Sequence, residues 1–206
     1  METLDVYLTK LASAEPTPGG GSAAMFVGAA GAGLVAMVMR ICAANPKYAD
    51  QRELALKLAL RADHLRAAFS DGRLRDEAAF GAVVAAQSLA RTTAEEKQSR
   101  ASRLEAALTV AALAPLGGME YALTLQHLTI DALAIRNPNL VSDLGCAGEF
   151  AVAALRACAY NVRVNHRYMK DAQTVASQAQ TVARYERESS AAAAAIRSAA
   201  ASELVG

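Results

Sequence analysis

The 206-residue chain has no tryptophan, and aromatic residues make up only 5% of it. Clusters of Val, Ile, Thr and aromatic residues of strand length are also missing, which argues against a β-sheet. The apolar fraction is nevertheless 53%, and alanine is its largest part. Because alanine has the best helix propensity and little side-chain entropy to lose, this composition predicts an all-α fold of closely packed helices.

The chain also lacks a strong charge of either sign. Its 21 basic and 20 acidic residues give a formal net charge of +1. Proteins that bind the phosphate backbone usually carry a basic stripe, and single-strand binders interleave Lys and Arg with aromatics. Neither pattern is present, so nucleic acid is not an expected partner.

Cysteine and histidine are scarce. Cys42, Cys146 and Cys158 have no CxxC spacing, which predicts three reduced core thiols in a cytoplasmic protein. The three histidines fall in separate segments, so we expect neither a metal site nor a cofactor. The N-terminus has no basic region followed by an apolar stretch, which argues against a secretory signal.

One long segment carries no charge. Residues 22–39 reach the lower limit for a membrane-spanning helix. They are rich in Ala and Gly, which contribute little transfer free energy, and no basic cluster precedes them. A membrane span is the alternative reading, but we expect a buried helix and no membrane association.

Apolar periodicity and breaker residues predict one domain over residues 1–206, with about eight helices. We expect the segment 22–44 to be the central helix, because it is apolar all round. Its small residues Ala24, Gly28, Ala32 and Ala36 recur at every fourth position and allow close packing by a neighbouring helix or a second subunit. The expected helices are 3–13, 22–44, 48–69, 74–89, 94–114, 119–135, 143–165 and 171–200.

Three consecutive glycines, Gly19 to Gly21, lead directly into the central helix. Their amides can approach a ligand closely, and a helix N-terminus favours an anion or a developing negative charge. No Gly-Lys-Ser/Thr follows and no strand precedes, so the segment is neither a P-loop nor a Rossmann turn. The alternative is a structural turn in which Ser22 caps the helix.

Asp76 shares a predicted helix face with Phe80, Val83 and Val84. A carboxyl group on an apolar face is costly to bury, and desolvation would raise its pKa toward the range useful for acid–base catalysis. An ordinary acid near a helix start is the alternative.

Two further polar groups are candidates for ligand recognition. Asn161 and Asn165 lie four residues apart on one helical face, although buried amides that bond to backbone are the alternative. In the segment 137–145, Ser142 is predicted to cap a helix that begins at Asp143. That function does not account for Asn139.

Together these motifs resemble the formiminotetrahydrofolate cyclodeaminase and methenyltetrahydrofolate cyclohydrolase family. The resemblance runs from about residue 4 to residue 171, with the motifs in family order and spacing. They are Glu15-Pro16-Thr17-Pro18-Gly19-Gly20-Gly21-Ser22, Lys47-Tyr48, Asp76-x-x-Ala79-Phe80, Asn137-Pro138-Asn139-x-x-Ser142-Asp143 and Asn161-Val162-Arg163-Val164-Asn165.

The resemblance implies a homodimeric helical bundle with a folate pocket and chemistry at the carbon that bridges N5 and N10 of tetrahydrofolate. It implies that Asp76 is the general base or acid. Lysines are fewer here than is usual beside Lys47, and Arg136 stands where glycine is common, so an altered substrate is possible. The implied substrate-binding residues are Pro18, Gly19, Gly20, Gly21, Ser22, Lys47, Tyr48, Asn139, Ser142, Asp143, Asn161 and Asn165.

The leading hypothesis is hydrolysis of 5,10-methenyltetrahydrofolate to 10-formyltetrahydrofolate, since the transferase domain of a bifunctional cyclodeaminase does not precede this segment. One carboxyl group serves either reaction, so formiminotetrahydrofolate cyclodeamination with release of ammonia stays open. A non-catalytic ligand-binding protein that kept the fold is the third alternative.

Overall fold

The structure is a computed structural model that describes residues 2–204. Within these residues it contains six α-helices and one short 3-10 helix, with no β-strand, which confirms the all-α prediction. The α-helices are α1 (Leu4–Leu11), α2 (Gly20–Ala44), α3 (Arg52–Gln87), α4 (Ala94–Leu133), α5 (Val141–His166) and α6 (Ala172–Leu204), and the 3-10 helix η1 spans Pro46–Gln51.

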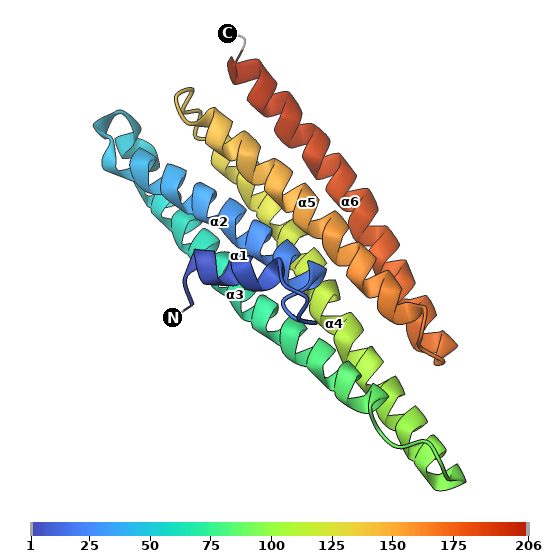
Figure 1. Cartoon of the computed structure of the whole chain (residues 1–206). Helices are drawn as coiled ribbons and strands as arrows, with labels where there is room; N and C mark the ends of the chain where they lie inside the picture. Colours follow the sequence, from blue (N-terminus) through green and yellow to red (C-terminus); the bar gives the residue numbers. More distant parts are fainter. Residues whose placement is uncertain (1, 205–206) are drawn as a thin grey trace.

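The five long helices form an elongated bundle, and α1 lies across α2 and α3 near its middle (Figure 1). α2 packs against α3, α5 and α4, while α6 covers α4 and α5 on the opposite side. One main apolar core joins α2 to α6, which agrees with a single domain. The predicted span 1–206 includes Met1, Val205 and Gly206, which lie outside the described residues.

The predicted central helix is confirmed as α2. All four small residues of its ridge are buried, and at Gly28 an added Cβ would lie 2.8 Å from Cδ1 of Phe69 on α3. The partner of the ridge at this point is therefore a neighbouring helix of the same chain. The close approach brings the start of α2 beside the middle of α3, where the candidate site lies.

The prediction of about eight helices is wrong because two expected breaks do not occur. α3 continues through Asp71 and Gly72, and α4 continues through Pro115 and Gly118. Gly118 marks a close helix crossing, since a Cβ there would lie 2.8 Å from Sγ of Cys158. Glycines in a helix interior can serve such crossings as well as ends.

Smaller corrections concern the start of α5 and one cysteine. α5 begins at Val141 with Leu140 as its N-cap, so Ser142 lies inside the first turn and is not the cap. Cys42 and Cys158 are buried as predicted, but Cys146 is exposed. Arg136 has a φ of 52°, in the left-handed region that favours glycine, which fits the glycine that the family resemblance implies at this position.

Two helices, α2 and α4, are long and apolar enough to cross a bilayer by length and composition alone. In α2 the most apolar window is 56% buried inside the bundle. Its apolar character is therefore largely accounted for by packing against α3 and α5.

Candidate active site

α2 begins at Gly20, two residues before the predicted start at Ser22, so Gly20 and Gly21 of the glycine turn lie in its first helical turn. Gly19 is the N-cap in extended conformation and supplies no side-chain hydrogen bond to the first amides of the helix. Those amides form a partial positive charge at the end of α2. The turn therefore presents hydrogen-bond donors, as the sequence predicted, and Ser22 does not serve as the cap.

The Asp76 carboxyl group of α3 lies against this turn. An added Cβ on Gly21 would be 2.6 Å from Cγ of Asp76, so only glycine leaves the carboxyl group its present position. The anion that the helix end favours is thus supplied by the protein itself. Asp76 and the triglycine turn converge as the mechanistic hypothesis requires.

Burial dominates the ionisation of Asp76 and raises its pKa from 3.8 to about 6. The backbone N–H of Ser22 acts in the opposite sense as a hydrogen-bond donor, and the negative charge of Glu77 raises the pKa further. A carboxyl group with a pKa of about 6 is partly protonated near neutral pH. It is therefore suited to both accepting and releasing a proton.

The two asparagines of α5 have fixed amide orientations. Asn161 donates from Nδ2 to the Ala157 carbonyl at 2.9 Å. Asn165 donates to the carbonyls of Asn161 at 2.8 Å and Ala111 at 3.2 Å. Within residues 2–204, neither Oδ1 atom accepts a hydrogen bond from protein. Both amides therefore keep an acceptor for a ligand.

These groups line one cavity of about 320 Å³. Its walls come from the glycine turn, α3, α4 and α5, and Asp76 is its one charged residue within the described part of the chain. The lining residues are Pro16, Thr17, Gly19, Gly20, Gly21, Asp76, Phe80, Val83, Gln87, Leu108, Ala111, Asn161, Val164, Asn165 and Tyr168.

Several lining residues were missed by sequence analysis. Gln87 continues the face of Asp76 and Phe80 along α3, so helical periodicity could have found it. Leu108 and Ala111 face the cavity from α4. Nothing in the sequence relates α4 to the glycine turn, because their proximity is set by tertiary packing.

Pro18 and Ser22 are buried beside the cavity and are not part of its lining. Five other predicted binding residues lie elsewhere. Asn137 contacts Sγ of Cys42 at 3.5 Å, which places the 137–140 turn beside the C-terminal end of α2. Asp143 precedes Asn161 on α5 by a distance of about 27 Å along the helix. A role in substrate binding stays a prediction for five residues that do not line this cavity, namely Lys47, Tyr48, Asn139, Ser142 and Asp143.

No group of three or more His, Cys, Asp or Glu side chains within residues 2–204 is arranged to hold a metal ion. The charged groups near the turn are instead paired with one another. Arg73 contacts Glu77 at 3.1 Å and Glu2 at 3.2 Å, and these three residues are not part of the cavity lining.

Comparison with known proteins agrees with this architecture. A family model described as formiminotransferase-cyclodeaminase matches residues 3–184. A methenyltetrahydrofolate cyclohydrolase of Methylorubrum extorquens is 36% identical over 170 residues, which cover 82% of each chain. The crystal structure of formiminotetrahydrofolate cyclodeaminase from Thermotoga maritima shares the fold, with a TM-score of 0.86, 22% identity, and coverage of 96% of this chain and 95% of that one. The chain therefore belongs to the formiminotransferase-cyclodeaminase family.

Proposed function

We propose that the chain is a folate one-carbon enzyme that hydrolyses 5,10-methenyltetrahydrofolate to 10-formyltetrahydrofolate. The observation that carries the proposal is the position of the Asp76 carboxyl group, which lies against Gly21 at the start of α2 and lines the cavity. Its burial there raises its pKa to about 6. The similarity to a methenyltetrahydrofolate cyclohydrolase supports the choice of substrate.

The first chemical step is addition of water to the amidinium carbon between N5 and N10. Asp76, in its ionised form, takes one proton from the water as the oxygen–carbon bond forms. Before the transfer its negative charge stabilises the cationic substrate, in a cavity that no Lys or Arg of residues 2–204 lines. The product of this step is a neutral tetrahedral carbinol.

The second step breaks the bond between the carbon and N5. N5 gains a proton as it leaves, the carbinol hydroxyl loses its proton, and the carbon becomes the formyl carbonyl on N10. Protonated Asp76 is positioned to supply the proton to N5, and the proton released overall goes to solvent. The developing carbonyl oxygen suits the amides of Gly20 and Gly21 at the end of α2.

The two asparagine side chains that line the cavity from α5 support recognition of a pterin ring. The pyrimidine edge of tetrahydropterin carries an N3–H and a 2-amino group, both donors. The Oδ1 atoms of Asn161 and Asn165 are the matching acceptors, and their amide groups cannot rotate without breaking the bonds to helix carbonyls. A fixed acceptor pair selects a ligand by the hydrogen bonds that it completes.

Formiminotetrahydrofolate cyclodeamination is the second candidate. There N10 attacks the formimino carbon, and an acid delivers a proton to the nitrogen that departs as ammonia. The raised pKa of Asp76 favours this reaction too, because a fraction of the carboxyl group stays protonated at neutral pH.

Two assays on the same protein preparation test these functions. One follows the loss of methenyltetrahydrofolate by absorbance, and the other measures ammonia released from formiminotetrahydrofolate. We expect faster turnover of the methenyl substrate, and a fall on the order of a hundredfold or more in Asp76→Asn with folate still bound. Turnover of neither substrate would contradict the enzyme proposal and favour a non-catalytic binding protein.

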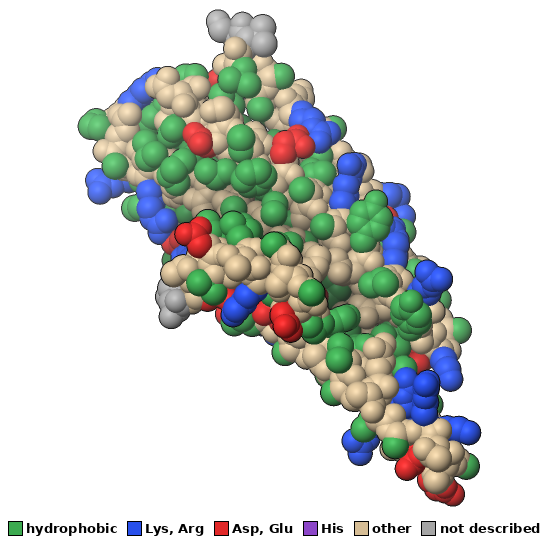
Figure 2. Space-filling model, in the orientation of Figure 1, with side chains coloured by type: hydrophobic (Ala, Val, Ile, Leu, Met, Phe, Trp, Pro, Cys, Tyr) green, Lys and Arg blue, Asp and Glu red, His purple; other side chains and the backbone are tan. Residues whose placement is uncertain are grey.

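We further propose that the chain forms a homodimer through the exposed face of α2. Phe26, Met37 and Ile41 recur on that face and are 37–44% exposed. In Figure 2 apolar side chains gather over the upper part of the molecule, where α2 lies, with Lys and Arg mainly at its edges. A two-fold axis would bring this stripe against the same stripe of a second copy.

Sedimentation of Ile41→Glu tests the dimer, with Leu113→Glu on α4 as the matched control. We expect a dimer for the parent chain and the control, and a monomer for Ile41→Glu. A monomeric parent would contradict it. A cytoplasmic location and independence from cofactors and membranes stay predictions.

A further inference from the structure

Two consecutive acidic residues of α3 hold Ser22 in different ways. Ser22 is fully buried, and its hydroxyl group donates to Oε1 of Glu77 at 2.7 Å. Its backbone N–H faces the carboxyl group of Asp76. Because consecutive side chains on a helix point about 100° apart, the two carboxyl groups lie on different sides of the start of α2.

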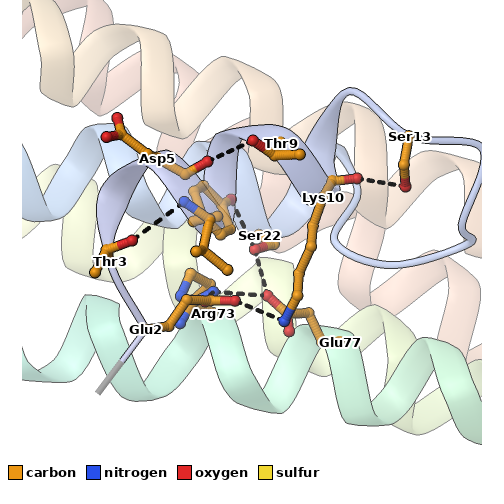
Figure 3. Close-up of polar contacts among 11 residues, drawn as sticks. Glu2, Thr3, Asp5, Thr9, Lys10, Ser13, Ser22, Arg73 and Glu77 are labelled. Carbon is orange, nitrogen blue, oxygen red and sulfur yellow. Dashed lines mark hydrogen bonds and ion pairs between the residues drawn. The ribbon is translucent and has the colours of Figure 1, made fainter.

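The hydrogen bonds of Ser22 have a defined direction. A carboxylate only accepts, so the Ser22 hydroxyl donates to Glu77, and the Tyr7 hydroxyl must then donate to Ser22, at 2.9 Å. Figure 3 shows Ser22 between α1 and Glu77, with Arg73 beside the carboxyl group. A single line of polar contacts thus joins α1, α2 and α3.

Arg73 completes this arrangement from α3. Its guanidinium lies over the Tyr7 ring at 4.7 Å and contacts Glu77 at 3.1 Å. Tyr7 is 4% exposed, whereas Leu4, Val6 and Leu8 of the same helix are 46–53% exposed. Tyr7 is therefore the side chain through which α1 is anchored to the bundle.

We propose that Tyr7, Ser22, Glu77 and Arg73 are positioning residues for Asp76. They hold the first turn of α2 in register with α3, so that the Asp76 carboxyl group stays against the Ser22 N–H and the Cβ-free surface of Gly21. Assembly of the acid–base site then depends on the docking of α1. The expected effect on kcat rests on the proposed function, but the titration of the Asp76 carboxyl group is measurable without substrate.

The charges around Asp76 make Glu77 the most informative position. Glu77 raises the pKa of Asp76, and Arg73 partly offsets its charge. Cys158 faces Asp76 from α5, and its thiol stays protonated because burial raises its pKa to about 12. From α1, Tyr7 also stays protonated, since burial raises its pKa, and Glu2 lies beyond Arg73.

The test compares three substitutions that separate hydrogen bonding from charge. Glu77→Gln keeps an acceptor for Ser22 but removes the charge, Glu77→Leu removes both, and Tyr7→Phe removes one hydroxyl group. Glu2→Gln is the matched control, because Glu2 contacts Arg73 and lies outside the contacts to Ser22. Each variant is measured for kcat, KM and melting temperature, and for titration of the Asp76 carboxyl carbon by 13C NMR, assigned with Asp76→Asn.

We expect kcat to fall on the order of tenfold in Tyr7→Phe and a hundredfold in Glu77→Leu, with KM within about threefold. Glu77→Gln should recover most of kcat while the Asp76 titration moves to lower pH. Glu2→Gln should match the parent. Melting temperatures that fall while kcat and the Asp76 titration stay unchanged would overturn the proposal.

The two proposals fail in distinguishable ways. If the parent protein turns over neither folate substrate, the proposed function is wrong, but the NMR titration still reports whether the variants disturb Asp76. If the parent is active and Tyr7→Phe changes neither the titration nor kcat, the positioning role is wrong and the function stands.

Discussion

Asn165 of α5 closes the gap in hydrogen bonding that Pro115 leaves in α4. Proline has no N–H, so the Ala111 carbonyl four residues earlier has no donor from its own helix. The Asn165 amide donates to that carbonyl at 3.2 Å across the helix interface. This contact fixes the Asn165 side chain and helps α4 to continue as one helix past the cavity.

A double-mutant cycle tests the coupling of Asn165 and Pro115. Asn165→Ala should lower the free energy of unfolding by about 2 kcal/mol, because it leaves a polar group without a partner. In a Pro115→Ala background the helix supplies its own N–H to Ala111, so the same change should cost about 1 kcal/mol less. Denaturant unfolding measures both, and strictly additive values would contradict the coupling.

Gly21→Ala should reduce activity without reducing stability. The new Cβ would displace the Asp76 carboxyl group, which is the end of a flexible side chain, while alanine is favoured in a helix by about 1 kcal/mol. We expect kcat to fall on the order of a hundredfold. Gly81→Ala on α3 is the control, because its Cβ would meet no atom of residues 2–204 within 4 Å and Gly81 does not line the cavity. Equal kinetics for the two variants would argue against close contact of Gly21 with Asp76.

The pH dependence of kcat/KM distinguishes the two candidate reactions. Burial raises the pKa of Asp76 to about 6. If Asp76 acts as the base in hydrolysis, kcat/KM should rise through pH 6 and level off above it. If it acts as the acid in ammonia release, the value should fall over the same range. Profiles without a transition near pH 6 would show that ionisation of Asp76 does not control kcat/KM.

Asp76→Asn should stabilise the protein at neutral pH. Because the folded-state pKa of about 6 lies above the ordinary 3.8, ionised Asp76 opposes folding, and this cost develops as the pH rises from about 4 to 6. With allowance for solvent screening, we expect a gain of about 1–2 kcal/mol at pH 7.5 and almost none at pH 3.5. Urea unfolding at both pH values provides the measurement. A variant less stable than the parent at pH 7.5 would contradict the burial cost.

Sequence analysis predicted correctly several features that depend on residues close together in the chain, such as the start of α4 and the faces of helices. The Thr-x-x-Glu pattern of Thr93 and Glu96 is typical of a helix start, and it forms a capping box at the start of α4, where the Glu96 N–H donates to the Thr93 hydroxyl at 3.2 Å. The predicted helix faces are also correct, since they direct Asp76 and the two asparagines toward the cavity that the glycine turn borders. Asp76 on the face of Phe80 is the clearest example.

Long-range packing explains what sequence analysis missed. Gly72 and Gly118 were interpreted as helix ends, but both face Met25 of α2, so small residues here permit close helix contact. The bond between Tyr7 and Ser22 could not be predicted, since it depends on how α1 crosses the bundle. The order of motifs along the chain does not give their separation in space. Lys47 was therefore predicted to bind substrate together with the glycine turn, although the two lie at opposite ends of α2.

α1 is held to the bundle mainly by Tyr7, and this weak attachment affects how the protein responds to heating. A helix of eight residues that buries one side chain should detach at a far lower free energy than global unfolding requires. Warming would then release Tyr7 while the five long helices remain folded. Thermal inactivation should precede the loss of helical circular dichroism, and added folate that needs the assembled cavity should narrow the gap between the two temperatures.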